Sequence, residues 1–116
     1  MITGMHSIIY AADAEAARAF FRDVLGLPYV DAYDGWLIFR QPPSELAVHP
    51  AETAGKHELY LMCDDLEQTM AGLTAKGAEF SSGVQQTGFG LMTTLMIPGG
   101  GQIGLYQPRH PTAYDL

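Results

Sequence analysis

A pattern that occurs twice in the chain constrains its fold more than any other feature. Residues 6–13 read HSIIYAAD and residues 57–64 read HELYLMCD, so each copy begins with His, continues through apolar residues and ends on Asp. The second copy starts 51 positions after the first, and the same offset aligns Gly26 with Gly77. Each copy predicts a short buried strand followed by a helix. Two copies of this length are too few and too long for a solenoid, which predicts two related modules in one domain.

The first module is predicted to contain a strand, a helix and three more strands. Asp13 can cap the helix, because its carboxylate accepts hydrogen bonds from free backbone N–H groups, and Gly26 can end it. The Asp-Gly pair at 34–35 predicts a hairpin turn. The expected elements are a strand at 5–12, a helix at 14–26, and strands at 27–33, 36–41 and 45–50.

The second module repeats this order. Asp64 is expected to cap its helix, Glu67 three residues later completes the spacing of a capping box, and Gly77 ends the helix. The expected elements are a strand at 57–63, a helix at 65–76, a weak strand at 78–83, a clear strand at 91–98, a glycine turn at 99–101 and a last strand at 102–108.

The predicted fold class is therefore α+β, with two βαβββ modules in one domain that spans residues 1–116. Module one covers about 1–51 and module two about 56–108. Residues 109–116 form a C-terminal tail with two turn signals, which predicts an arm or loop. The repeat predicts that the two modules are related by a pseudo-twofold axis.

Composition excludes several classes of function. The formal charge of −7, from 13 acidic against 6 basic residues, gives no basic patch for nucleic acid. No apolar run approaches the length of a membrane span. Cys63 is the only cysteine, so no intrachain disulfide is possible and we expect a cytoplasmic protein. The diffuse acidity serves solubility or attracts a cationic ligand, and the sequence leaves both open.

The two histidines that open the copies are candidate metal ligands. Neutral imidazole is the commonest nitrogen ligand in proteins, and a pseudo-twofold axis would relate His6 to His57 and let them converge on one cleft. A catalytic metal usually has three protein ligands, however, so two histidines alone do not make a site.

The doubled pattern resembles the vicinal oxygen chelate superfamily, which includes glyoxalase I, bleomycin-resistance proteins and extradiol dioxygenases. The stretch HSIIYAADAEAARAFFRDVLGL matches the opening of that family, and IPGGGQIGLYQP matches its ending. The resemblance covers essentially the whole chain. It implies a curved, mostly antiparallel sheet that surrounds a cleft, and it implies a homodimer, in some members by exchange of modules.

The resemblance also implies a metal site with ligands on the first, fourth, fifth and eighth strands. His6 and His57 match two of these positions, but Gly104 stands where the family has a Glu. Glu45 or His49 could supply a third ligand only if a strand bulge or register turned it into the cleft.

Two functions from different classes follow. The favoured one is a bleomycin-resistance-like protein that binds an apolar or aromatic small molecule without a catalytic metal. The alternative is a glyoxalase-like or dioxygenase-like enzyme, a lyase, isomerase or dioxygenase that uses Zn, Ni, Mn or Fe on His6 and His57. Large side chains in predicted strands are more often core than cleft, but an apolar cleft with a few polar groups suits such a ligand. The predicted cleft residues are His6, Trp36, His57, Tyr60, Met92 and Tyr106.

Overall fold

The computed structural model describes Met1 and residues 5–116, and it confirms the α+β class. The elements, in chain order, are α1 (Ala14–Ala19), the π-helical turn η1 (Phe20–Val24), β1 (Tyr29–Asp31), β2 (Leu37–Phe39), β3 (Tyr60–Met62), α2 (Leu66–Ala75), β4 (Gln85–Thr87), β5 (Gly90–Ile97) and β6 (Gly101–Pro108).

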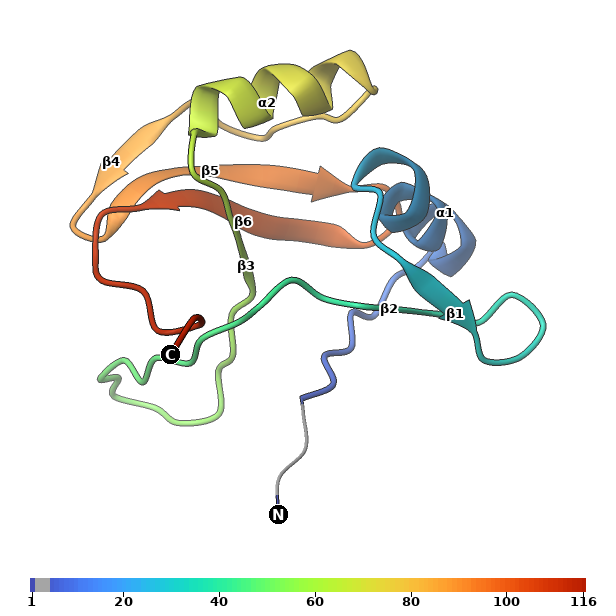
Figure 1. Ribbon diagram of the computed structural model, residues 1–116, viewed down its shortest axis with the longest axis horizontal. Coiled ribbons are helices and arrows are strands. Elements are labelled where there is room, and N and C mark those ends of the chain that lie inside the picture. Colours follow the sequence, from blue (N-terminus) through green and yellow to red (C-terminus); the bar gives the residue numbers. More distant parts are fainter. Residues whose placement is uncertain (2–4) are drawn as a thin grey trace.

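The second module provides the main sheet. Its four strands lie in the order β3-β6-β5-β4, with β3 parallel to β6 and the other neighbours antiparallel. β5 and β6 are the two longest strands and form a hairpin through the predicted glycine turn, where Gly99 and Gly101 have positive φ. β3 and β6 are parallel neighbours, and the chain that connects them passes through α2. Such a crossover cannot lie in the plane of the sheet, so α2 lies across one face of it. Figure 1 shows α2 over β5 and β6.

Both helices cover the same face of this sheet. Ala17 and Phe20 from α1 and η1 pack with Leu95, Ile97 and Ile103 from β5 and β6, and together they make the core of the chain. Burial of such apolar side chains stabilises the fold by roughly 25 cal/mol per Å² removed from water. α2 is fixed at its start, because Leu66 is fully buried and its N–H donates to the Gln107 side chain of β6 at 3.0 Å.

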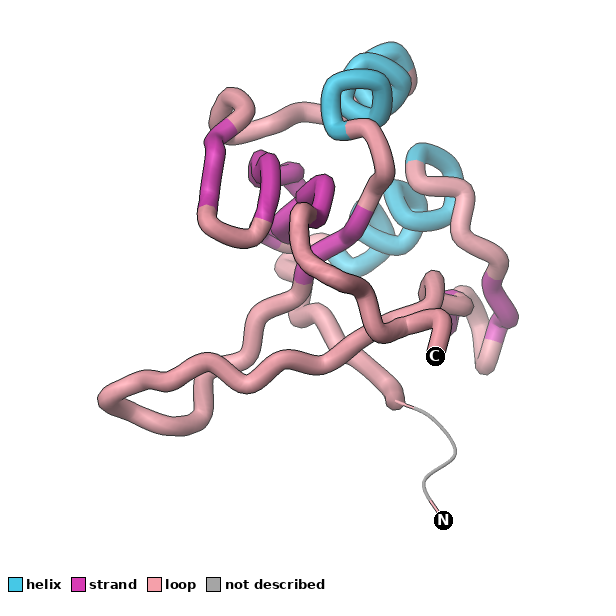
Figure 2. Tube along the Cα trace, turned by 60° about the vertical axis from the view of Figure 1, so that its left-hand side comes forward, coloured by secondary structure: helices cyan, strands magenta, loops and turns pink. Residues whose placement is uncertain are grey.

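The first module is far less complete than expected. Within the described part of the chain, β1 and β2 pair only with each other, around the predicted Asp-Gly turn, in which both residues have positive φ. Strands are expected at residues 5–12 and 45–50, and the structure corrects this, because it places both segments in loop. A strand needs a neighbour for its backbone N–H and C=O groups, and an apolar sequence alone does not supply one. Figure 2 shows how much of this half is loop.

Three further predictions for the second module need correction. The helix cap is Asp65, whose carboxylate accepts from the Gln68 N–H at 3.1 Å, and not Asp64. The capping box of Asp64 with Glu67 is therefore wrong by one residue. The weak strand at 78–83 shrinks to a single bridge between Phe80 and Leu95. β4 was not predicted, because Gln85–Thr87 has no apolar alternation.

Other local predictions are confirmed. Asp13 caps α1, where its carboxylate accepts from the Ala16 N–H at 3.0 Å. Gly26 and Gly77 follow the two helical segments with φ of 69° and 93°, which is the left-handed region that favours glycine at a helix end. Among the helices of the described residues, none has both the length and the apolar character that crossing a membrane requires.

Candidate functional site

The candidate site lies on the face of the four-stranded sheet that the helices leave open. Side chains alternate along a strand, so Leu95, Ile97 and Ile103 turn towards the helices and their neighbours turn away from them. Across the open face, Gly104 of β6 lies between Tyr60 of β3 and Thr94 of β5. Figure 1 places the N-terminal segment and the C-terminal tail on the side of the sheet opposite α2.

A cavity of about 440 Å³ opens on this face, and we call it the sheet cleft. Its walls are divided about equally between apolar and polar groups, so the cleft offers a small molecule both apolar contact and hydrogen bonds. The residues that line it are Ile9, His57, Glu58, Leu59, Tyr60, Met92, Thr94, Gln102, Ile103 and Gly104.

Gly104 lies under the ring of Tyr60 in this cleft. A Cβ atom at position 104 would lie 2.1 Å from Tyr60 Cδ1 and 2.5 Å from Cε1, far inside van der Waals contact. The backbone of Gly104 does not have positive φ, so nothing in its own conformation demands glycine. The ring of Tyr60 is what excludes a side chain there.

Tyr60 is held by a polar chain at the cleft wall. Its hydroxyl donates to Glu58 Oε2 at 2.5 Å, and the other oxygen of Glu58 faces Lys56 Nζ at 2.8 Å. The hydrogen bond to the carboxylate and, after it, partial burial raise the pKa of Tyr60 to about 12. The hydrogen bonds from Lys56 and then from Tyr60 lower the pKa of Glu58, so the carboxylate is charged at neutral pH.

Tyr60 also belongs to a cluster of three aromatic rings with Phe89 and Tyr106. The ring centroids of Tyr60 and Tyr106 are 5.8 Å apart, those of Phe89 and Tyr106 are 5.2 Å apart, and both pairs meet edge to face. Such pairs stabilise beyond the area they bury, by about 0.5–1.5 kcal/mol each. Burial first, and the nearby Glu45 carboxylate second, raise the pKa of Tyr106. Tyr106 lies beside the cleft and supports the Tyr60 ring.

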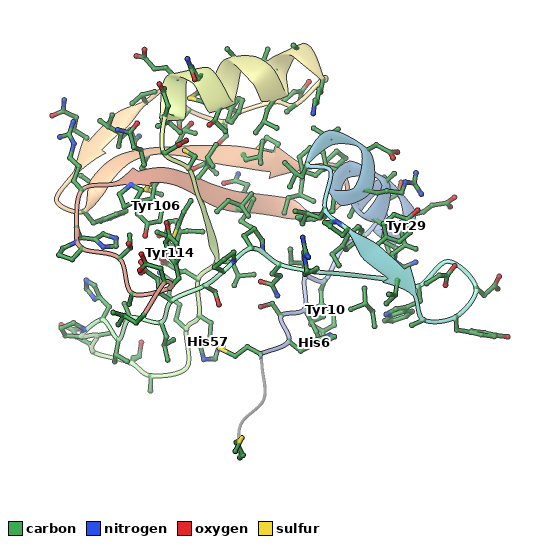
Figure 3. All side chains as sticks on the ribbon, in the orientation of Figure 1. His6, Tyr10, Tyr29, His57, Tyr106 and Tyr114 are labelled. Carbon is green, nitrogen blue, oxygen red and sulfur yellow. The ribbon has the colours of Figure 1, made fainter. Side chains whose placement is uncertain are left out.

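Glu45 contacts the C-terminal tail and not the histidines named with it as candidate ligands. Its Oε2 accepts from the Ala113 N–H at 2.7 Å, and its Oε1 lies 3.7 Å from His110 Nε2. The same nitrogen of His110 lies 3.1 Å from the hydroxyl of Tyr106. In Figure 3 Tyr106 and Tyr114 appear in this region, where the tail returns beneath the sheet.

The structure brings together only some of the predicted cleft residues. His57, Tyr60 and Met92 line the sheet cleft, whereas His6 and Trp36 are not among its lining residues. Figure 3 shows His6 and His57 on the side of the sheet away from α2, in separate segments. Trp36 lies by the β1–β2 turn, with Arg18 Cζ of α1 4.9 Å from its ring centre.

Sequence reasoning missed Glu58, Thr94 and Gln102 as cleft residues. Alternation along the strands could have identified two of them, because Thr94 shares the face of Met92, and Gln102 shares the face of Gly104. The same rule extends to Glu58, which shares the face of Tyr60 in the strand expected at 57–63, although the structure places Glu58 just before β3.

The candidate metal ligands do not come together as a set of three in the described part of the chain. Among Met1 and residues 5–116, no group of three or more His, Cys, Asp or Glu side chains is arranged to hold one. His49, the other candidate third ligand, has its Nδ1 2.6 Å from the carbonyl oxygen of Pro50, its own neighbour in the chain. The remaining candidate ligand is Glu45, and its carboxylate is bound to the C-terminal tail.

Comparison with known proteins gives a family match. The sequence profile of the Glyoxalase/Bleomycin resistance protein/Dioxygenase superfamily matches residues 4–105, which is most of the chain. No curated protein matches it.

Several solved structures share the fold. One is an antibiotic-binding protein from a Streptomyces species, with a TM-score of 0.67 and 23% identity over 93% of this chain and 98% of the other. A lactoylglutathione lyase from Agrobacterium tumefaciens has a TM-score of 0.65 and 20% identity over 90% of this chain and 92% of the other. A third protein, from Sphaerobacter thermophilus, has a TM-score of 0.64 and 21% identity over 90% and 97% of the two chains. At these identities the likeness concerns the fold alone.

Proposed function

The chain belongs to the Glyoxalase/Bleomycin resistance protein/Dioxygenase superfamily, and from that premise we propose that its sheet cleft binds an apolar or aromatic small molecule without a catalytic metal. The composition of the cleft carries this proposal. Leu59, Met92 and the ring of Tyr60 offer apolar contact, while His57 and Gln102 offer hydrogen bonds that would orient a ligand. A methionine wall adapts to irregular ligands, and an aromatic wall stacks on flat ones.

The metal-dependent enzyme is the second candidate. The fold likeness to a lactoylglutathione lyase supports the enzyme candidate, but no contact among the described residues favours it. Lewis-acid chemistry needs a held ion and a group that moves a proton, and the position of a carboxylate at 104 is taken by a glycine. The choice between the two candidates therefore depends on a metal measurement.

The remaining expectations stand as parts of the same proposal. We propose a cytoplasmic homodimer that binds neither nucleic acid nor membrane. The single cysteine supports the cytoplasmic location, and the formal charge of −7 supports the expectation that the protein does not bind nucleic acid. The large apolar side chains exposed in module one support the homodimer.

A ligand titration tests the main proposal. Anilinonaphthalene sulfonate serves as a fluorescent probe and a panel of flat aromatic compounds as competitors, all in the presence of a chelator. Thr94→Trp fills the cleft and is expected to weaken binding at least tenfold, which is about 1.4 kcal/mol. Thr74→Trp is the matched control, because Thr74 is an exposed threonine on α2. Equal binding by both variants would place the probe outside the cleft and contradict the proposal.

A metal titration separates the two candidates. The protein is purified without chelator or histidine tag, its metal content is measured, and Zn²⁺, Ni²⁺, Mn²⁺ and Fe²⁺ are titrated by calorimetry. We expect no stoichiometric metal and no difference between the wild type and His6→Ala/His57→Ala. A bound metal that the double variant loses would sink the metal-free proposal and favour the enzyme.

A further inference from the structure

The contact between Gly104 and Tyr60 leads beyond the ligand proposal. The two residues are direct partners across β6 and β3, and the ring leans over the glycine so that a Cβ at 104 would meet three of its carbons at 2.1, 2.5 and 3.1 Å. These atoms belong to the ring itself and not to the tip of a flexible side chain. Any side chain at position 104 must displace the whole ring.

The ring is not free to move aside without loss. Its hydroxyl bonds to Glu58, and its edge and face meet Tyr106 and Phe89, with centroids 5.8 and 6.2 Å away. Turning the ring away from Gly104 would break the hydrogen bond to a charged acceptor and at least one aromatic contact. Hydrogen bonds to charged groups and aromatic pairs both contribute measurably to stability.

We propose that Tyr60 occupies the space in the sheet cleft that a ligating side chain at position 104 would need, so that this cleft is built around a phenol ring in place of a metal ligand. The glycine at position 104 and the tyrosine at position 60 then belong together, because the ring fills the space that a carboxylate at 104 would need. Position 104 and position 60 must change together before the cleft can take a metal-binding side chain at 104.

This inference concerns the cleft of the proposed function but does not require that a ligand be found there. It rests on packing between two residues, and it is measured on the free protein. A failed ligand titration therefore leaves it standing, and a failed packing test leaves the ligand proposal standing.

A double-mutant cycle tests the packing. The free energies of unfolding of the wild type, Gly104→Ala, Tyr60→Ala and the double variant are measured in denaturant. We expect Gly104→Ala to lower the unfolding midpoint clearly in the wild type, and most of that loss to disappear when Tyr60 is already alanine. Gly83→Ala is the control, because nothing lies within 4 Å of a Cβ at that position. Additive losses would overturn the inference.

A metal titration tests the consequence. Gly104→Glu supplies the carboxylate, and its Ni²⁺ affinity is compared with that of Tyr60→Ala/Gly104→Glu. We expect Gly104→Glu to give no gain over the wild type while Tyr60 is present, and a gain of at least tenfold over Tyr60→Ala when the ring is removed. His57→Ala should abolish that gain, because His57 lines the same cleft. An equal gain in both backgrounds, or none in either, would overturn the inference.

Discussion

At the scale of the residue, one hydrogen bond controls the ionisation of Tyr60. The carboxylate of Glu58 accepts from the phenol, which favours the neutral form and raises the pKa of Tyr60 to about 12 from its ordinary value of 10.0. A group whose pKa is raised on folding stabilises the folded state at any pH below its ordinary pKa. That stabilisation is lost as the pH rises through the pKa of the folded state. The window for Tyr60 is therefore about pH 10 to 12.

This arrangement predicts the result of an alkaline titration. The phenolate absorbance of Tyr60, isolated as the difference between the wild type and Tyr60→Phe, should rise near pH 12. Glu58→Gln keeps the shape and removes the charge, so the pKa of Tyr60 should fall towards 10.0. Glu67→Gln on α2 is the control. If Glu58→Gln leaves the transition where it was, Glu58 is not the acceptor that holds the phenol.

Individual cleft residues were only partly predictable from the sequence. Tyr60 and Met92 were named as cleft residues and both line the sheet cleft, but alternation alone did not decide which of the large side chains face it. The sequence also showed glycine at position 104 where the resemblance implies a glutamate, but it did not predict that the ring of Tyr60 fills that space. That contact depends on the register between β3 and β6, which are far apart in the chain, and a register is fixed by long-range packing.

At the scale of the element, the start of α2 gives a test that discriminates two adjacent acids. The structure assigns the cap to Asp65, whose carboxylate accepts from the Gln68 N–H, whereas the repeat pointed to Asp64. Loss of an N-cap costs about 1 kcal/mol. Asp65→Ala should therefore lower the free energy of unfolding by about that amount in urea.

The neighbouring acid is the matched control for this test. Asp64→Ala removes the same charge one residue earlier and should change stability by no more than about 0.5 kcal/mol, as an exposed substitution does. A larger loss for Asp64→Ala than for Asp65→Ala would restore the cap that the repeat suggested and contradict the structure here.

Elements were predicted well where their stabilising contacts are local. α1, α2 and the β5–β6 hairpin depend on caps, helical spacing and a tight turn, and each appears close to its expected place. The strand expected at 5–12 is as apolar as β5, and the one expected at 45–50 contains Leu46 and Val48, yet both segments lack regular strand structure. Apolar sequence says that a segment is to be buried, but the strand itself exists only through hydrogen bonds to a neighbour.

At the scale of the whole molecule, module one exposes large apolar side chains of the kind that a domain normally buries. Ile8 is 63% exposed, Trp36 61%, Leu46 78% and Val48 92%, although all are large apolar residues. A hollow of about 390 Å³ lies along β1 and β2 with mostly apolar walls. The radius of gyration is 15.0 Å, whereas a compact chain of this length has about 13 Å. An apolar surface of this extent is typical of a subunit that associates.

The apolar side chains of module one therefore predict a homodimer in which residues 5–12 and 45–50 meet a second copy. Val48→Asp places a charge where that contact would bury it, which is costly without a partner, so the variant should shift the protein from dimer to monomer. Val84→Asp makes the same chemical change in module two, where Val84 is 43% exposed, and should leave the dimer intact. Sedimentation velocity at micromolar concentration measures both. A wild-type chain that sediments as a monomer would show that module one remains exposed in solution, and equal dissociation by both variants would mean that added charge acts without regard to its position.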